Sequence, residues 1–258
     1  MKQNSTITVC SFAIGENYRK ELENLIKSTY KYSPDVNLYV GVGEVGNNII
    51  RAQFQRSSTN FDKFCQEELV DIPVPADLIC NWNNIGFIKA YWMLHVMRHM
   101  KNEKFGEILL WLDADARVRG DLSILDEELG EADIGMVKFE GDHWLNGTIA
   151  MRITHENEMF LERWWKKCRA LFRPEHDDWR LNDQTVMKNM MIEGDSPPVK
   201  DLGEKWASLP PNLVGDKNNP VPVRPRMEDA LIHHWQMSRS VIKGWAWPPE
   251  EGKRYKDE

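Results

Sequence analysis

The chain alternates between short apolar runs and longer stretches in which apolar residues recur every three or four positions. The short runs predict strands at 7–12, 36–42, 108–112, 133–139 and 145–151. The longer stretches predict helices after Gly15, over 84–100, over 156–172 and from 183 onward. A strand, a helix and a second strand at the start are typical of a doubly wound α/β sheet.

Two parts of the chain show neither pattern clearly. Residues 44–82 mix polar and apolar positions, and Pro73 and Pro75 interrupt any helix there, so we expect irregular structure. Residues 197–225 are rich in Pro, Gly and Asn and are too long for an ordinary loop, which favours a segment wrapped over a site. After them, an apolar strand from Ala230 leads into the pair His233 and His234.

The run Ile108–Leu112 is the element around which we place the rest. It is unbroken, as expected of a central strand covered on both faces, and it ends abruptly in Asp113-Ala-Asp115. Ligands bind at the carboxyl ends of the strands in open α/β sheets, and two such carboxylates suit Mg²⁺ or Mn²⁺, which would in turn hold a phosphate. The alternative is that both acids simply end the strand and cap the next turn.

Composition narrows the class of protein. A chain of 258 residues with a net charge of -7 suits one α/β domain and argues against a generally basic nucleic-acid binder. Four scattered cysteines predict neither a zinc site nor disulfides, and no signal peptide or membrane-length apolar run is visible, so we expect a cytoplasmic protein. The first loop lacks the Gly-x-Gly-x-x-Gly pattern of nicotinamide and flavin dinucleotide sites.

A basic residue accompanies the acidic pair. Lys89 lies on the helix predicted just before the Asp113 strand, where its ammonium could approach a phosphate at the strand end. The more common explanation of a single lysine is a place on the surface.

These pieces, in this order, resemble the GT-A type of nucleotide-sugar glycosyltransferase, particularly the glycogenin-like galactosyltransferase group and the nucleotide-diphospho-sugar transferase-like proteins of bacteria and phages. The resemblance rests on Lys89, Asp113-x-Asp115, Asn146-Gly147, Asp183-Gln184, Leu209-Pro210-Pro211, Ile232-His-His234-Trp235 and Lys243-Gly-Trp245. It implies one Rossmann-like GT-A domain over 1–258 with a mainly parallel central sheet. Residues 1–120 would form the nucleotide-binding half, and 121–258 the acceptor and metal-completing half.

The resemblance also implies roles for the metal ligands. Asp113, Asp115 and His234 would hold Mn²⁺ or Mg²⁺. Successive residues on a strand face opposite ways, so only one of His233 and His234 can do so, and the aromatic Trp235 favours His234.

Other residues would contact the donor. Lys89, Asn146 and Gly147 would line the sugar nucleotide, and Lys243 would bind its phosphates. The chain between His234 and Lys243 is longer than in the family, so Arg239 competes with Lys243 for that role.

Asp183 and Gln184 match the pair that lies beside the reacting carbon. A carboxylate there would stabilise a cation-like sugar or deprotonate the acceptor hydroxyl. The alternative for Asp183 is a helix N-cap, because Asn182-Asp183-Gln184 opens a predicted helix. Only the analogy with glycogenin-like enzymes favours retention of configuration.

The expected activity is metal-dependent transfer of a hexose or pentose from a nucleoside-diphosphate sugar, with a UDP-sugar as the expected donor. Two stretches mix aromatic and basic residues, 164–173 and 235–254, so a hydroxymethylated base in phage DNA is one candidate acceptor, and the protein would then work in the host cytoplasm. Glycan, protein and small-molecule acceptors are the alternatives. A haloacid-dehalogenase-like phosphatase is a rival class, disfavoured by Arg117 after the second Asp.

Overall fold

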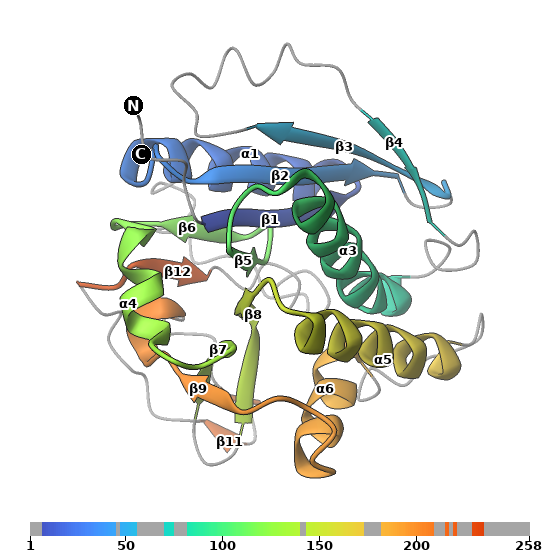
Figure 1. Ribbon diagram of the computed structural model, residues 1–258. Coiled ribbons are helices and arrows are strands. Elements are labelled where there is room, and N and C mark those ends of the chain that lie inside the picture. The colour runs from blue at the N-terminus through green and yellow to red at the C-terminus, as the bar shows by residue number, and fades with distance from the viewer. Residues whose placement is uncertain are drawn as a thin grey trace.

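The computed structural model describes residues 7–44, 47–55, 70–74, 82–139, 143–172, 182–208, 215–216, 219–220 and 229–234. An eight-stranded sheet with the order β4-β3-β2-β1-β5-β8-β7-β9 forms its centre. These strands are β1 (Ile7–Ile14), β2 (Asn37–Gly43), β3 (Ile49–Gln55), β4 (Val70–Pro73), β5 (Ile108–Leu112), β7 (Ile134–Phe139), β8 (His143–Arg152) and β9 (Val199–Asp201). The expected α/β class is confirmed (Figure 1).

The strand directions make the sheet mixed but mostly parallel. β2, β1 and β5 are parallel neighbours, and β7 and β9 form another parallel pair. Within this sheet β3 and β8 run opposite to the others, so each forms antiparallel ladders on both of its sides. The central strand β5 therefore has a parallel neighbour in β1 and an antiparallel neighbour in β8.

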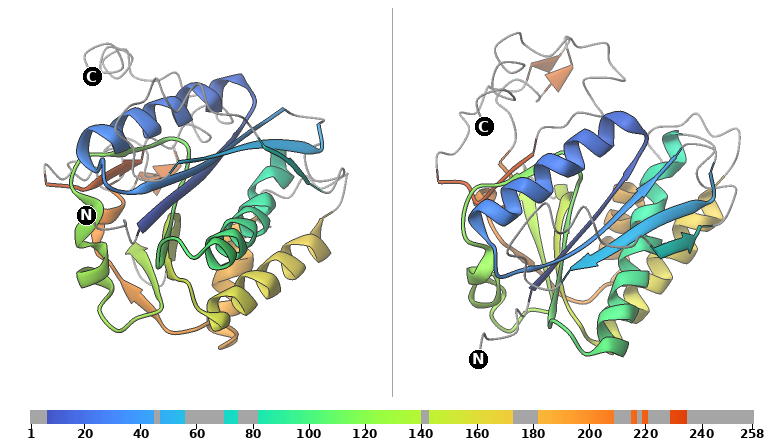
Figure 2. Two further views of the ribbon diagram at one scale, coloured as in Figure 1. Left: turned by 45° about the horizontal axis from the view of Figure 1, so that its top comes forward. Right: turned by 90° about the horizontal axis from the view of Figure 1, so that it is seen from above.

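Helices cover both faces of the sheet. One apolar core joins α1 (Glu16–Tyr32) to one face, and another joins α3 (Trp82–Glu103), α5 (His155–Leu171) and α6 (Asp183–Ile192) to the other (Figure 2). β5 supplies Leu110 to the first core and Trp111 to the second, and all five of its residues are buried. The prediction of a strand covered on both faces is confirmed.

Smaller elements complete the described chain. β6 (Ala116–Val118) follows β5 and pairs antiparallel with β12 (Ile232–His234). A 3₁₀ turn (Leu122–Ile124), α4 (Leu125–Leu129) and a second 3₁₀ turn (Glu204–Trp206) connect longer elements, and β10 (Gly215–Asp216) pairs with β11 (Asn219–Pro220).

The expectation of irregular structure over 44–82 was wrong where the structure describes that region. β3 and β4 lie there as an antiparallel extension of the sheet. The polar residues Gln53 and Gln55 are buried in β3, and the Tyr30 hydroxyl donates a 2.6 Å hydrogen bond to Gln55 Oε1. A buried polar residue, whose hydrogen bond comes from a helix, interrupts the alternation of apolar and polar residues by which a strand is recognised in sequence.

A bulge in β8 interrupts the ladder between β8 and β7. Met136 of β7 lies opposite Ile149, but the next residue, Val137, lies opposite Leu145. Asn146, Gly147 and Thr148 therefore have no partner on β7, and bulges of this kind redirect side chains next to functional sites.

Two further expectations can be compared with the described residues. Cys10 and Cys168 are buried free thiols. Among the described helices, none combines the length and apolar character that a bilayer crossing requires.

Candidate functional site

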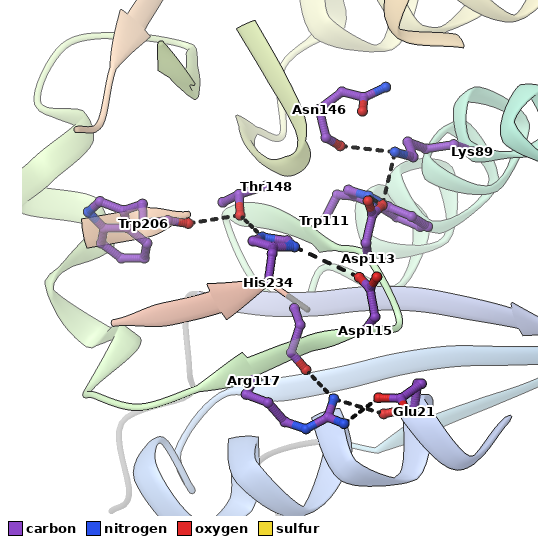
Figure 3. Close-up of polar contacts among 11 residues, drawn as sticks. Glu21, Lys89, Trp111, Asp113, Asp115, Arg117, Asn146, Thr148, Trp206 and His234 are labelled. Atoms are coloured by element: carbon purple, nitrogen blue, oxygen red, sulfur yellow. Dashed lines mark hydrogen bonds and ion pairs between the residues drawn. The ribbon is translucent and has the colours of Figure 1, made fainter. Parts of the chain in front are cut away.

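The two acids after β5 lie at a tight turn between two strands. The Asp113 backbone N–H donates to Gly147 O at 2.9 Å, and the Ala116 N–H donates to Asp113 O at the same distance. The chain then enters β6, where Ala116 pairs with His234 of β12. This pairing brings a residue from the end of the described chain next to the acidic turn (Figure 3).

Asp113, Asp115 and His234 form one cluster of potential metal ligands. Each offers one atom, and these atoms lie within 4.8 Å of one another. His234 Nδ1 is 4.0 Å from Asp115 Oδ1, and both side chains are almost fully buried. Of the two histidines that the sequence left open, it is His234 that joins the cluster.

A hydrogen-bond chain sets the orientation of the His234 ring. The Thr148 hydroxyl donates to Trp206 O at 2.8 Å, and His234 Nε2 lies 2.8 Å from the same Thr148 oxygen (Figure 3). Because the hydroxyl proton is used by Trp206, Thr148 accepts the proton of Nε2. A neutral His234 then presents the lone pair of Nδ1 to the two aspartates.

Gly147 leaves room at this cluster. A Cβ atom at this position would lie 2.9 Å from His234 Cε1 and 3.1 Å from Asp113 Oδ2. Any larger residue would displace those side chains or fill the space between them. Two carboxylates and an imidazole nitrogen around such a space fit a divalent cation of the Mn²⁺ or Mg²⁺ kind.

Lys89 is not a surface lysine. Its side chain is buried, and Nζ lies 2.9 Å from Asp113 Oδ1, 3.3 Å from Asp183 Oδ2 and 3.0 Å from Asn146 O. Burial acts to lower the pKa of Lys89, but the carboxylates of Asp113 and Asp183 outweigh it and raise the pKa above its usual value. Lys89 is therefore a fixed positive charge between the two carboxylates.

Trp111 binds the same oxygen of Asp113 that Lys89 contacts. Its indole Nε1 donates to Asp113 Oδ1 at 2.8 Å, and the Lys89 ammonium lies 5.2 Å from the indole centre (Figure 3). Trp111 is buried in β5, so it positions the carboxylate from a rigid element.

Asp183 does not cap its helix. Asn182 is the N-cap of α6, because its side-chain oxygen accepts a 2.9 Å hydrogen bond from the Thr185 N–H. The Asp183 carboxylate instead accepts a hydrogen bond from Asn146 Nδ2 at 2.5 Å and faces Lys89. Burial raises its pKa, and the opposing effect of Lys89 does not cancel this shift.

The start of α6 is held on three sides. Trp164 Nε1 donates to Asp183 O at 3.1 Å, and Gln184 Nε2 donates to Trp144 O at 2.9 Å. Gly86 of α3 comes so close that a Cβ there would lie 2.8 Å from Asp183 Oδ1. The backbone around the Asp183 carboxylate is therefore fixed by α3, α5 and β8.

Arg117 anchors the acidic turn from the opposite face of β6. Its guanidinium is buried, donates to Ala116 O at 2.8 Å and forms an ion pair with the buried Glu21 of α1 (Figure 3). It points away from Asp113 and Asp115, so it holds the backbone and takes no part in the cluster.

Several site residues expected from the sequence lie outside the described residues, and the sequence did not indicate the role of Thr148. Arg239, Lys243, Trp235 and the segment 209–211 lie outside the described residues. Thr148 was not singled out, because its role depends on contacts with Trp206 and His234 that are distant in sequence.

Two lysines in the described part of the basic and aromatic stretch at 164–173 form ion pairs on the surface. Trp164 is fully buried, Lys166 pairs with Glu162, and Lys167 pairs with Glu193 and Asp195. Arg169 of the same stretch is exposed, and its guanidinium lies 5.9 Å from the centre of the Trp165 ring. The second stretch, 235–254, lies outside the described residues.

Comparison with known proteins places the fold. No protein-family model matches the sequence, and no curated protein sequence matches it. One similar solved structure is a glycosyltransferase involved in the glycosylation of the major capsid of PBCV-1, with 12% identity, a TM-score of 0.51, and coverage of 93% of this chain and 99% of that one. Another is the bifunctional glycosyltransferase WbbM in its apo form, with 14% identity and a TM-score of 0.53 over 99% of this chain. The chain spans about half of WbbM, 52% of its length.

Proposed function

We propose that this chain, whose fold is that of solved glycosyltransferases, transfers a sugar from a nucleoside-diphosphate sugar to an acceptor hydroxyl. The observation that carries the proposal is the convergence of Asp113, Asp115 and His234 next to Lys89 and Asp183 at the carboxyl end of β5. We assign residues 1–120 to the nucleotide-binding half and 121–258 to the acceptor and metal-completing half. A UDP-sugar is the donor we propose.

The residues present supply what this transfer needs. Departure of the nucleoside diphosphate builds negative charge on its phosphates, and a fixed ammonium such as Lys89 stabilises that charge. A divalent cation held by Asp113, Asp115 and His234 would add Lewis-acid stabilisation of the same oxygens. Asn146 and Gly147 stand between these groups, where the donor sugar would lie.

Asp183 is the group we assign to the reacting carbon. Its buried carboxylate is held by Asn146 and Lys89. In this position it would stabilise a cation-like sugar carbon or remove the proton from the acceptor hydroxyl. Gln184 beside it fixes the backbone through Trp144 O. The rival phosphatase chemistry gains no support, because this chain has Arg117 two residues after the second Asp, where the phosphatase motif has Thr or Val.

The first prediction concerns the cation and the donor. UDP with Mn²⁺ at about a hundred times its dissociation constant should raise the melting temperature by roughly 5–10 °C, because a ligand bound only to the folded state stabilises it. Differential scanning fluorimetry should show no such shift for Asp113→Asn or Asp115→Asn, or for the wild type in EDTA. Release of UDP from UDP-sugars, measured with the wild type, identifies the transferred sugar. An equal shift in EDTA would contradict the metal assignment.

The second prediction concerns Thr148. Thr148→Val removes the oxygen that accepts the His234 Nε2 proton at almost unchanged volume, so Mn²⁺ affinity should fall by about 10–100-fold. Electron paramagnetic resonance of free Mn²⁺ measures this affinity without any turnover. Thr148→Ser keeps the hydroxyl and should restore most of it. Equal affinities for the two variants would show that the hydrogen bond does not orient the ligand.

A further inference from the structure

A cavity of about 560 Å³ lies between α6, the β7–β8 hairpin and the segment that leads into β9. Its walls include Lys138 and Trp144 from the hairpin, Lys188 and Ile192 from α6, and Pro197 and Pro198. This volume is in the range of small-molecule sites, roughly 300–1,000 Å³. No role has yet been given to it.

Both walls of the cavity lead to the candidate catalytic carboxylate. α6 begins at Asp183, and Lys188 lies on the next turns of the same helix. On the other side, Trp144 is two residues before Asn146, which donates to Asp183 Oδ2. Gln184 ties the two walls together through Trp144 O. The acceptor hydroxyl must reach the donor sugar beside Asp183, and Lys188 in the cavity wall is five residues, or about 7.5 Å along the helix axis, from Asp183.

The chemistry of the walls selects the kind of acceptor. Among the described residues that line the cavity there are two lysines, Lys138 and Lys188, and no acidic side chain, although the whole chain has a net charge of -7. The Lys138 ammonium lies 5.8 Å from the centre of the Trp144 ring. An indole with cations beside it suits a ring-shaped ligand that carries a negative group.

We propose that this cavity binds the acceptor, and that the acceptor is a saccharide bearing a carboxylate or phosphate group. The inference rests on the proposed transfer of sugar and specifies its substrate. The volume of about 560 Å³ suits a ligand of a few sugar rings. The basic side chains Lys166 and Lys167 on α5, which could have continued a track for phosphates, are paired with acidic residues.

Binding of the protein to an array of glycans and oligonucleotides tests the inference. The panel holds neutral glycans, glycans with uronic or sialic acid, phosphorylated glycans and single-stranded DNA oligonucleotides, and the full chain is applied with Mn²⁺ and UDP. We expect binding to carboxylate-bearing or phosphate-bearing glycans, and the two groups show which anion is recognised. Lys188→Glu and Trp144→Ala should weaken that binding at least about tenfold in titration calorimetry. The matched charge reversal Lys166→Glu, outside the cavity, should leave it unchanged.

Several results would overturn the acceptor site. They are equal binding of neutral glycans, binding of DNA alone, no glycan binding, or full binding by Lys188→Glu. The thermal shift with UDP and Mn²⁺ separates this failure from failure of the proposed function. A wild type that shows the shift without selecting anionic glycans loses only the acceptor assignment, whereas a wild type without the shift loses the transferase proposal itself.

Discussion

Asp183→Asn should lower the rate of sugar transfer by about 10²–10⁴-fold, the contribution of a positioned proton-transfer group. Asn has nearly the same shape and can still accept the hydrogen bond from Asn146, so the fold around the start of α6 should persist. The lost negative charge removes the group that we assign to the reacting carbon. Steady-state release of UDP measures kcat, and calorimetry measures donor affinity, which should change little.

Asn182→Ala is the control for the helix start. It removes the side chain that caps α6 and should cost about 1 kcal/mol of stability while leaving kcat near its original value. If Asp183→Asn and Asn182→Ala lowered kcat alike, Asp183 would act through the helix and not at the reaction centre. A kcat unchanged in Asp183→Asn would exclude the proposed role altogether.

Arg117→Met should destabilise the protein by about 3–5 kcal/mol, because it leaves the Glu21 carboxylate buried without its cation. Arg117 and Glu21 are 5% and 7% exposed, so water cannot replace the missing partner. For a domain of this size the loss corresponds to a fall in melting temperature of roughly 10 °C, which calorimetry or denaturant unfolding measures.

The double substitution Arg117→Met with Glu21→Leu is the matched comparison. Replacing both members of a buried pair by apolar residues is often neutral, so most of the lost stability should return. Arg117→Met with an unchanged melting temperature would show that the pair does not hold β6 against α1.

Local signals in the sequence predicted the centre of the fold well. Ile108–Leu112 is an unbroken apolar run, and all five residues are buried in β5. The helices α1, α3 and α5 carry apolar residues at helical spacing, and each packs on the sheet. β3 and β4 were missed because buried glutamines and one proline give no clear alternation.

The candidate site depends on contacts that local signals do not encode. The residue types Lys89, Asp113, Asp115 and Asp183 could be picked out, but not the burial of Lys89 between carboxylates. The choice between His233 and His234 depends on the register of β12 against β6, and the cap at Asn182 on the side-chain geometry of one turn. Pairing across more than a hundred residues is fixed by the whole sheet and not by neighbours in sequence.

The bulge in β8 explains why Asn and Gly occur in the interior of the sheet. Asn and Gly are poor strand formers, and a regular central strand would select against both. Asn146 and Gly147 stand outside the ladder with β7, so pairing with that strand does not depend on their strand propensity. Residues unsuited to a sheet interior are thus tolerated there, and their identity is free to follow the needs of whatever binds beside them.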